Sequence, residues 1–403
     1  MNENQKDSDP PPPLYRFDPL APILFITLIF FLTFLARVAL SPLMPDIEAE
    51  MGISHTQAGS LFFIMSVGYF IALISSGFIS ARIQHRRTIV LSACGSGLGL
   101  LLIALSHQLW QIQVSVFIMG TAAGIYLPSG ITTLTSMVDA RHWGKAVSIH
   151  ELAPNLAFVA APLIAEIFLL NYSWRAMPAT IGTIAILIGA AFIFSGKGGN
   201  FPGKQPDASA FRTLAADRGF WIMVVLFGLA ISSTMGVYTM LPLYLVNEIQ
   251  IDRSYANSLL AFSRLPGLAM ALIAGWASDR YGPRRTIVVM LVSTGITTIL
   301  MGVLQQPGAI TLLVIAQASL STGFFPPGFA VLSAVSPPAH RNVAVSLAIP
   351  IAFVYGGGIS PFIIGMAGDA GIFAGGIILV GVLIGVGGLL AFKIPLDDPR
   401  SRS

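Results

Sequence analysis

A five-residue string, RRTIV, occurs twice in this chain of 403 residues, at 86–90 and at 284–288. The two copies begin 198 residues apart (86 against 284), so one repeat unit is about half of the chain. The two arginines that begin each copy also end a short charged segment. These segments are GFISARIQHRR at 77–87 and GWASDRYGPRR at 275–285, and long apolar runs flank both of them. A half-length repeat in an apolar chain predicts a duplicated membrane bundle.

The composition excludes a soluble fold for most of the chain. Hydrophobic residues make up 55% and charged residues only 10%, against about 25% charged in a typical soluble domain. The single cysteine, Cys94, lies inside an apolar run, which excludes a disulfide framework and a cysteine metal site. No Walker motif, haem spacing, metal ligand set or nucleophilic triad is present. We therefore predict no enzymatic activity, no cofactor and no metal.

Twelve apolar runs are long enough to cross a membrane, which takes about 20 residues in a helix. The predicted fold is an all-α integral membrane protein with two pseudo-symmetric halves of six transmembrane helices each. The predicted spans are about 20–44, 56–80, 88–107, 109–138, 144–170 and 175–196 in the first half, and 219–246, 254–278, 286–304, 308–336, 343–368 and 371–393 in the second.

The only long polar interruption separates these two groups of spans. We predict a disordered cytoplasmic N-terminal segment at 1–19, a first six-helix bundle at 20–196, a cytoplasmic linker at 197–218, a second bundle at 219–393 and a cytoplasmic tail at 394–403. The first apolar run is too long for the core of a signal peptide.

The basic residues predict the orientation. With both termini inside, 18 of the 22 lysines and arginines fall in cytoplasmic segments, Arg175 and Arg253 fall outside, and Arg37 and Arg264 fall within spans. We therefore predict a multi-pass protein of the inner or plasma membrane with cytoplasmic N and C termini. The positive net charge then reflects the orientation of the chain in a lipid bilayer, and no nucleic-acid partner is expected. We expect a monomer.

Twelve helices in two repeats, with GxxxDRxGxRR between the second and third helix of a half, resemble the major facilitator superfamily of secondary transporters. The resemblance covers nearly the whole chain after residue 20. The first copy departs from the motif, since Ala81 replaces the acidic residue and Gln84 the second glycine, and Val116 stands where many members carry an arginine. The resemblance implies transport by alternating access between the two halves.

The second loop copy is the predicted gate. Asp279 lies at the C-terminal end of the eighth span, where the helix dipole disfavours an anion, so it needs a compensating partner. The resemblance implies that this acid latches the cytoplasmic side, and repeat symmetry places its partner near Gly144. Gly275 would permit close helix approach and Gly282 a tight turn. The predicted gating residues are Gly275, Asp279, Arg280, Gly282, Arg284 and Arg285, with Gly77, Arg86 and Arg87 in the first copy. The alternative is that the paired arginines only fix the topology.

Two arginines inside predicted spans are candidates for substrate binding, because a charge within the bilayer marks a functional site or a paired charge. The sequence RVALSPLMP around Arg37 resembles the first helix of organic-anion and phosphate-ester carriers, and Arg264 is placed like the substrate arginine of nitrate-type carriers. A guanidinium offers planar, bidentate donors to a carboxylate or phosphate. Alternatively, Arg37 pairs with an acid such as Glu151, and Arg264 snorkels or pairs. The predicted substrate-binding residues are Arg37, Arg264, Asn155, Thr234 and Tyr238.

The fifth span carries the candidate proton site, His150 and Glu151. Glu151 and Asn155 are four residues apart and share a helix face, which we assign to the cavity. His150 lies about 100° around the helix from Glu151, on a stripe of small residues suited to helix packing. If a proton and the anion compete for one arginine, their fluxes are coupled. The alternative is a permanent salt bridge between Glu151 and an arginine.

The sequence thus predicts a secondary active transporter of a small organic anion, a carboxylate, moved by symport with protons. A proton-antiporting exporter of amphiphilic drugs or metabolites is the first alternative. A non-transporting substrate sensor of the same fold is the second.

Overall fold

The computed structural model describes residues 20–203, 208–337 and 341–395. The predicted disordered segment at 1–19 and most of the predicted tail at 394–403 lie outside the described residues. Within them, the chain is helical apart from short connections and contains no strand. The all-α prediction is therefore confirmed.

The first half consists of eight α-helices. They are α1 (Leu20–Val38), α2 (Leu40–Met51), α3 (His55–Ala104), α4 (Leu109–Gly124), α5 (Tyr126–Ser136), α6 (Trp143–His150), α7 (Leu152–Asn171) and α8 (Ala176–Ser195), with a 3-10 turn, η2 (Ala140–His142), before α6. A short helix, α9 (Ala208–Ala215), lies in the linker.

The described residues of the second half form ten α-helices, three π-helical segments and a final 3-10 turn. In order they are α10 (Arg218–Ile231), η3 (Ser232–Gly236), α11 (Val237–Leu243), η4 (Tyr244–Glu248), α12 (Arg253–Phe262), α13 (Leu265–Tyr281), α14 (Pro283–Val303), α15 (Pro307–Thr322), α16 (Phe325–Val335), α17 (Arg341–Phe353), η6 (Val354–Ile359), α18 (Ser360–Asp369), α19 (Phe373–Gly388) and η7 (Leu389–Lys393).

Eleven helical runs in the described ranges are long and apolar enough to cross a membrane. One of them, α3, has 50 residues and contains a non-helical residue, Gln84, with φ 73° and ψ 158°. A crossing takes about 20 residues, so α3 holds two crossings that Gln84 separates. The structure therefore agrees with the twelve predicted spans.

Several membrane helices are interrupted near their middle by proline. Proline lacks the amide hydrogen that would bond to the carbonyl four residues earlier, and its ring clashes with that carbonyl. The interruptions at Ala39, Ile125, Glu151, Ser263 and Gly323 each lie three residues before a proline, namely Pro42, Pro128, Pro154, Pro266 and Pro326. Three ionisable residues, Arg37, Glu151 and Arg264, therefore lie at or beside helix breaks.

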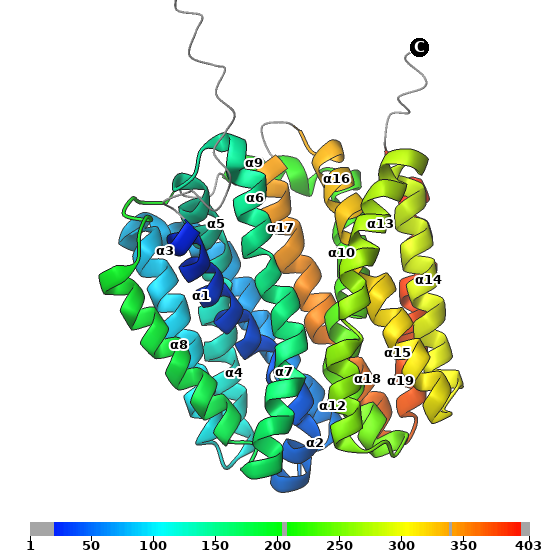
Figure 1. The fold of residues 1–403 in the computed structure, drawn as a ribbon. Helices are drawn as coiled ribbons and strands as arrows, with labels where there is room; N and C mark the ends of the chain where they lie inside the picture. The colour runs from blue at the N-terminus through cyan, green and yellow to red at the C-terminus, as the bar shows by residue number, and fades with distance from the viewer. Residues whose placement is uncertain (1–19, 204–207, 338–340, 396–403) are drawn as a thin grey trace, which may run out of the picture.

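The helices of each half pack mainly with one another. In the first half α3 packs against α4 and α8, and in the second α14 packs against α19 and α10 against α17. Figure 1 shows the blue-to-green first half beside the second half, which runs from yellow-green to red, and α17 of the second half lies next to the first half. We call the end of the bundle that carries α9 the linker end. The opposite end, with the connections at 52–54, 172–175 and 370–372, is the far end.

The two halves contact each other closely toward the far end, where α18 packs on α3, α12 on α7 and α11 on α2. Glycine permits the closest approach. A Cβ added at Gly59 would lie 2.6 Å from the Pro361 carbonyl oxygen, and one at Gly365 would lie 2.2 Å from the His55 carbonyl oxygen. Larger residues at these positions would separate α3 from α18.

The start of the linker is bound to the break in α3. The backbone N–H of Arg86 donates to the Gly199 carbonyl at 2.9 Å, and the N–H of His85 donates to the Phe201 carbonyl at 3.3 Å. These amides begin the second crossing of α3 and have no partner within their own helix. The linker therefore caps this helix end.

Candidate functional site

Two arginines lie buried in the bundle, one from each half. Arg37 lies near the end of α1 and is 5% exposed, and Arg264 lies between α12 and α13 and is 9% exposed. Neither forms an ion pair with any described carboxylate. The Nε atom of each is buried without a hydrogen-bond partner among the described residues.

Aromatic rings surround the Arg37 guanidinium. Its central carbon lies 4.2 Å from the centroid of Tyr69, 4.5 Å from that of Phe353 and 4.8 Å from that of Phe34. The negative faces of such rings attract a cation, with about 0.5–2 kcal/mol for each contact. Phe353 comes from the second half, so both halves contribute to this environment.

Arg264 has a similar environment on the other side of the interface. Its central carbon lies 4.3 Å from the Phe158 centroid and 4.5 Å from the Tyr238 centroid, and one Nη donates to the Thr234 carbonyl at 2.7 Å. Thr234 belongs to η3, and the preceding carbonyl in this π turn, that of Ser233, accepts a bond from Gln317 at 2.9 Å. Such π turns often occur at functional sites.

A single pair of aromatic rings separates the two guanidinium groups. Phe34, which contacts Arg37, lies 5.3 Å from Phe158, which contacts Arg264. Tyr238 packs edge-on against Phe158 at 4.9 Å and donates its hydroxyl to the Phe158 carbonyl at 3.2 Å. Of the five predicted substrate-binding residues, the structure brings Arg264, Thr234 and Tyr238 into contact and places Arg37 one ring pair away.

Asn155, the fifth predicted residue, lies apart from this group. Its amide is exposed and donates to the Glu151 carbonyl at 3.1 Å. Glu151 instead contacts its neighbour, with one carboxyl oxygen 3.3 Å from Nδ1 of His150. The glutamate is 49% exposed and the histidine is fully buried. The described residues thus hold a His150–Glu151 pair, and the alternative Glu151–arginine bridge is absent from this structure.

The predicted Asp279 latch is not formed in this structure. Asp279, Arg280 and Arg285 are exposed, and Asp279 has no hydrogen bond or ion pair with another described residue. A Cβ added at Gly275 or Gly144 would meet no described atom within 4 Å, so the expected close helix approach at Gly275 is absent here. Gly282 has φ 91°, a value that glycine adopts readily. The Asp279 latch stays a prediction.

The first arginine of each RR pair has a local structural role. Arg86 donates to the carbonyls of Ile193 (2.9 Å) and Phe192 (3.3 Å) near the end of α8, and Arg284 donates to the Ile394 carbonyl (2.5 Å) just after η7. Cations bind favourably to the carbonyls that end a helix. Each arginine thus ties its loop to the last helix of its own half. Arg87 is exposed, and Gly77 lies within α3.

The far end carries a cross-half contact that the sequence analysis missed. The Asp369 carboxylate, at the end of α18, accepts bonds from the Ser54 hydroxyl (2.6 Å), the His55 amide (2.9 Å) and the Thr56 amide (3.0 Å). It therefore caps the N-terminus of α3 from the other half. An aspartate at the C-terminal end of its own helix is a signal that could have revealed this partner.

A second cross-half contact lies beside α12 and α7. Arg253 of the second half bonds to Asp46 at 3.0 Å and lies 3.6 Å from Glu166, and Asn257 donates to Glu166 at 2.9 Å. Together with the Asp369 cap, these bonds hold the far end closed.

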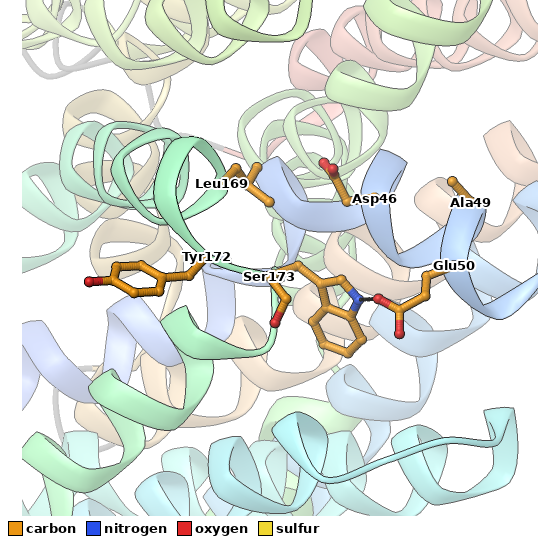
Figure 2. A pocket seen from close by; sticks show the side chains of 7 residues that line it. Asp46, Ala49, Glu50, Leu169, Tyr172 and Ser173 are labelled. Carbon is orange, nitrogen blue, oxygen red and sulfur yellow. Dashed lines mark hydrogen bonds between the residues drawn. The ribbon is translucent and has the colours of Figure 1, made fainter.

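A hollow of about 370 Å³ opens at the far end. Asp46 and Glu50 of α2 line it together with the chain after α7 (Figure 2), and the Trp174 indole donates to Glu50. That bond measures 2.7 Å, and Arg175 also pairs with Glu50. The acids that line this hollow, Asp46 and Glu50, are already paired with arginines, and neither Arg37 nor Arg264 lines it. The hollow is therefore not the candidate site.

Comparison with known proteins identifies relatives along nearly the whole chain. The family model described as Major Facilitator Superfamily matches residues 26–263 and 225–403. Multidrug resistance protein MdtL of Klebsiella pneumoniae is 23% identical over 350 residues, which cover 85% of this chain and 86% of that protein. A probable L-galactonate transporter of Escherichia coli K12 is 24% identical over 274 residues, covering 62% of this chain and 60% of that protein. Membrane sensor protein UhpC of the same strain is 22% identical over 344 residues, covering 78% and 76%.

A solved structure shares the fold. A bacterial homologue of the human lysosomal transporter Spinster, in an inward-facing and unoccupied conformation, superposes with a TM-score of 0.82 over 93% of this chain and 96% of that chain, at 14% identity. At this identity the likeness concerns the fold alone.

Proposed function

Because this chain belongs to the Major Facilitator Superfamily and is a multi-pass membrane transporter, not an enzyme, we propose that it carries a small organic anion, a carboxylate, together with protons. One observation carries the proposal. Arg37 and Arg264, from opposite halves, are buried near each other without a described carboxylate partner.

The charge of this pair favours an anionic substrate. Removing an ion from water costs several kcal/mol even after the protein relaxes, and the aromatic contacts offset only part of that cost. The two unpartnered Nε–H groups leave donors available to an acceptor. A carboxylate bound between the halves would supply both the counter-charge and the acceptor oxygens. A cationic drug would add like charge to the site.

The rings around the arginines favour a substrate with an apolar or planar body. Phe34, Phe158, Tyr69, Tyr238 and Phe353 form the walls next to the two guanidinium groups. A carboxylate with such a body would neutralise the arginines and pack against the rings.

The closed far end and the basic loops support a proposal about which end of the bundle faces the cytoplasm and gives access to the site. We propose that the linker end is cytoplasmic, in accordance with the excess of lysine and arginine there. The far end, closed by Asp369 and Arg253, then faces outside, and Glu151 reaches water from the cytoplasmic side. The Asp279 latch would form only when the two halves rock to the opposite state.

The test uses proteoliposomes that contain only this protein and a pH indicator inside. We expect external mono- or dicarboxylates to acidify the interior, and we expect Arg37→Ala to abolish the signal. Lys145→Ala, at an exposed position on α6, is the matched loss of a cation and should retain transport. Silence of the folded wild-type protein across the panel would refute anion symport.

A second function has support of its own. The similarity to MdtL and the five aromatic rings beside the site favour an exporter of amphiphilic compounds driven by proton antiport. In the same liposomes, such an antiporter would alkalinise the interior when an amphiphile supplied outside is carried inward, because protons then leave in exchange. Binding without any flux would instead favour the sensor function that the name of UhpC describes for that relative.

A further inference from the structure

We propose that His150 and Glu151 form a binding site for a single proton, and that Tyr126 positions this proton by fixing the tautomer of His150. The use of this proton in coupling rests on the proposed function. The site itself rests on hydrogen-bond geometry inside the first half.

Three aromatic rings form the core of the site. His150 at the end of α6 and Tyr126 at the start of α5 are 0% and 1% exposed. Their rings are nearly coplanar, with an interplanar angle of 2°, and Phe30 of α1 stacks over both, 4.3 Å from the histidine centroid and 5.1 Å from the tyrosine centroid. The imidazole therefore has one orientation, and its two nitrogens each face one oxygen.

The tyrosine hydroxyl determines the state of Nε2. Its oxygen lies 2.8 Å from the Ile26 carbonyl and 3.1 Å from Nε2 of His150. A carbonyl only accepts hydrogen bonds, so the one hydroxyl hydrogen points to Ile26. The hydroxyl oxygen then accepts a hydrogen from Nε2, and His150 keeps its proton on that nitrogen.

The remaining nitrogen shares the exchangeable proton with Glu151. Nδ1 lies 3.3 Å from the glutamate Oε1. With the first proton on Nε2, a neutral imidazole presents a bare Nδ1, which would repel a carboxylate. The contact therefore requires one hydrogen between the two atoms, on nitrogen in an imidazolium–carboxylate pair or on oxygen in a neutral acid. In both forms the pair has zero net charge, and loss of this proton to water leaves it at −1.

Apart from Tyr126, no ionisable group contacts the pair within the described residues. Lys145 on the same helix is exposed, and Arg141 of η2 pairs with Asp139 at 3.6 Å. The elements packed around α6 contribute Phe30 and the Ile26 carbonyl from α1 and Tyr126 from α5. The half-exposed Glu151 is the route by which the proton reaches water.

The position of the site explains how a proton and an anion could be linked. Helix α1 contacts the site through Phe30, which stacks on His150, and through the Ile26 carbonyl, which accepts from Tyr126, and it carries Arg37 further along. An anion bound at Arg37 disfavours a second negative charge in the same half, so it strengthens proton binding at the pair. By reciprocity the bound proton strengthens anion binding to the same degree. Such mutual strengthening is what symport requires.

The first experiment does not depend on transport. Purified protein labelled with ¹⁵N only in histidine is titrated in detergent micelles, and His150→Gln identifies the two signals of His150. We expect Nε2 to stay protonated throughout while Nδ1 loses its proton in one step. In Tyr126→Phe we expect a mixture of tautomers after that step. A deprotonated form with its hydrogen on Nδ1, or an unchanged tautomer in Tyr126→Phe, would overturn the proposal.

Tyr244→Phe is the matched control, because this buried tyrosine of the second half donates to the Met301 carbonyl at 2.8 Å. It should leave the His150 signals unchanged. In liposomes, Tyr126→Phe should retain anion exchange while the pH profile of net uptake shifts, and a profile that does not move would refute the link to coupling. Absence of anion transport by the wild-type protein would refute only the proposed function, since the titration would still report the proton site.

Discussion

A buried guanidinium without a carboxylate is the most informative single feature of this molecule. Arg37 lies against three aromatic rings, yet a ring contributes only about 0.5–2 kcal/mol and supplies no net charge. The desolvation cost of several kcal/mol is therefore not fully offset within the described part of the chain. We therefore expect this site to bind an anion, because an anion would supply the missing counter-charge.

Lysine in place of Arg264 tests the geometry of the site apart from its charge. Lysine keeps the cation but loses the planar fork that reaches the Thr234 carbonyl and a bound carboxylate together. A charge-assisted hydrogen bond contributes about 1.5–3 kcal/mol, and 1.4 kcal/mol is a factor of ten. We expect Arg264→Lys to raise the half-saturating carboxylate concentration about tenfold or more, measured by the acidification of liposomes.

Arg175→Lys is the control for this substitution. Arg175 pairs with Glu50 at the far end, away from the two buried arginines, and its replacement should leave the half-saturating concentration unchanged. An unchanged value in Arg264→Lys would contradict a direct contact between Arg264 and the substrate.

The sequence alone identified the arginines and two neighbours of Arg264, Thr234 and Tyr238, but not the phenylalanine rings around them. Arg37 and Arg264 are conspicuous because each interrupts an apolar run. Phe34 and Phe158 are two of 26 phenylalanines, and no local pattern distinguishes a ring beside an arginine from a ring in contact with lipid. The role of Tyr126 could not be predicted for the same reason, because it depends on a histidine 24 residues away.

At the scale of helices, prolines determine where the membrane helices are interrupted, and candidate functional residues lie at those interruptions. Breaks at Glu151 and Ser263 follow from Pro154 and Pro266, and they place Glu151 and Arg264 where the helix is interrupted. The sequence predicted the spans well because apolar length is a strong signal. It did not predict the breaks, because proline is common in membrane helices and many prolines leave a helix continuous.

The break in α3 is strained. Gln84 has φ 73° and ψ 158°, close to the φ 91° and ψ 144° of Gly282 at the equivalent place in the second half. This region is nearly restricted to glycine, and such strain costs about 1–3 kcal/mol. Glycine adds about 0.5–1 kcal/mol of backbone entropy cost. We expect Gln84→Gly to stabilise the protein by up to about 2 kcal/mol, measured as a higher midpoint of thermal unfolding in detergent.

Gly282→Ala provides the opposite change. It should lower the unfolding midpoint, because alanine must adopt the same positive φ although no atom lies near its Cβ. A lower midpoint for Gln84→Gly than for the wild-type protein would show that the glutamine side chain contributes more than the strain costs.

At the scale of the whole molecule, we expect the balance between two conformations to depend on the contacts between the halves at the far end. Asp369 caps α3 across the interface, and removing an N-cap costs about 0.5–2 kcal/mol. One kcal/mol shifts an equilibrium about fivefold. We expect Asp369→Ala to raise by about fivefold or more the rate at which a membrane-impermeant thiol reagent, added from the far end, modifies Ser41→Cys in a Cys94→Ser background.

Asp252→Ala is the control that distinguishes the loss of a contact between the halves from the loss of a helix cap. Asp252 caps its own helix, α12, at the same end by accepting from the Tyr255 amide at 3.1 Å, and this bond lies within one half. Its loss should leave the modification rate near the wild-type value. Equal rates for Asp369→Ala and the parent protein would show that the cap does not control opening.

The cap that the linker places on α3 has a consequence for biosynthesis. The second crossing of α3 begins with amides that bond to the Gly199 and Phe201 carbonyls, more than a hundred residues later in the chain. Those carbonyls emerge from the ribosome only after all six spans of the first half. The first half is therefore finished by the beginning of the linker, and a translation product that stops at Gly196 would contain every helix of that half but lack its closing contact.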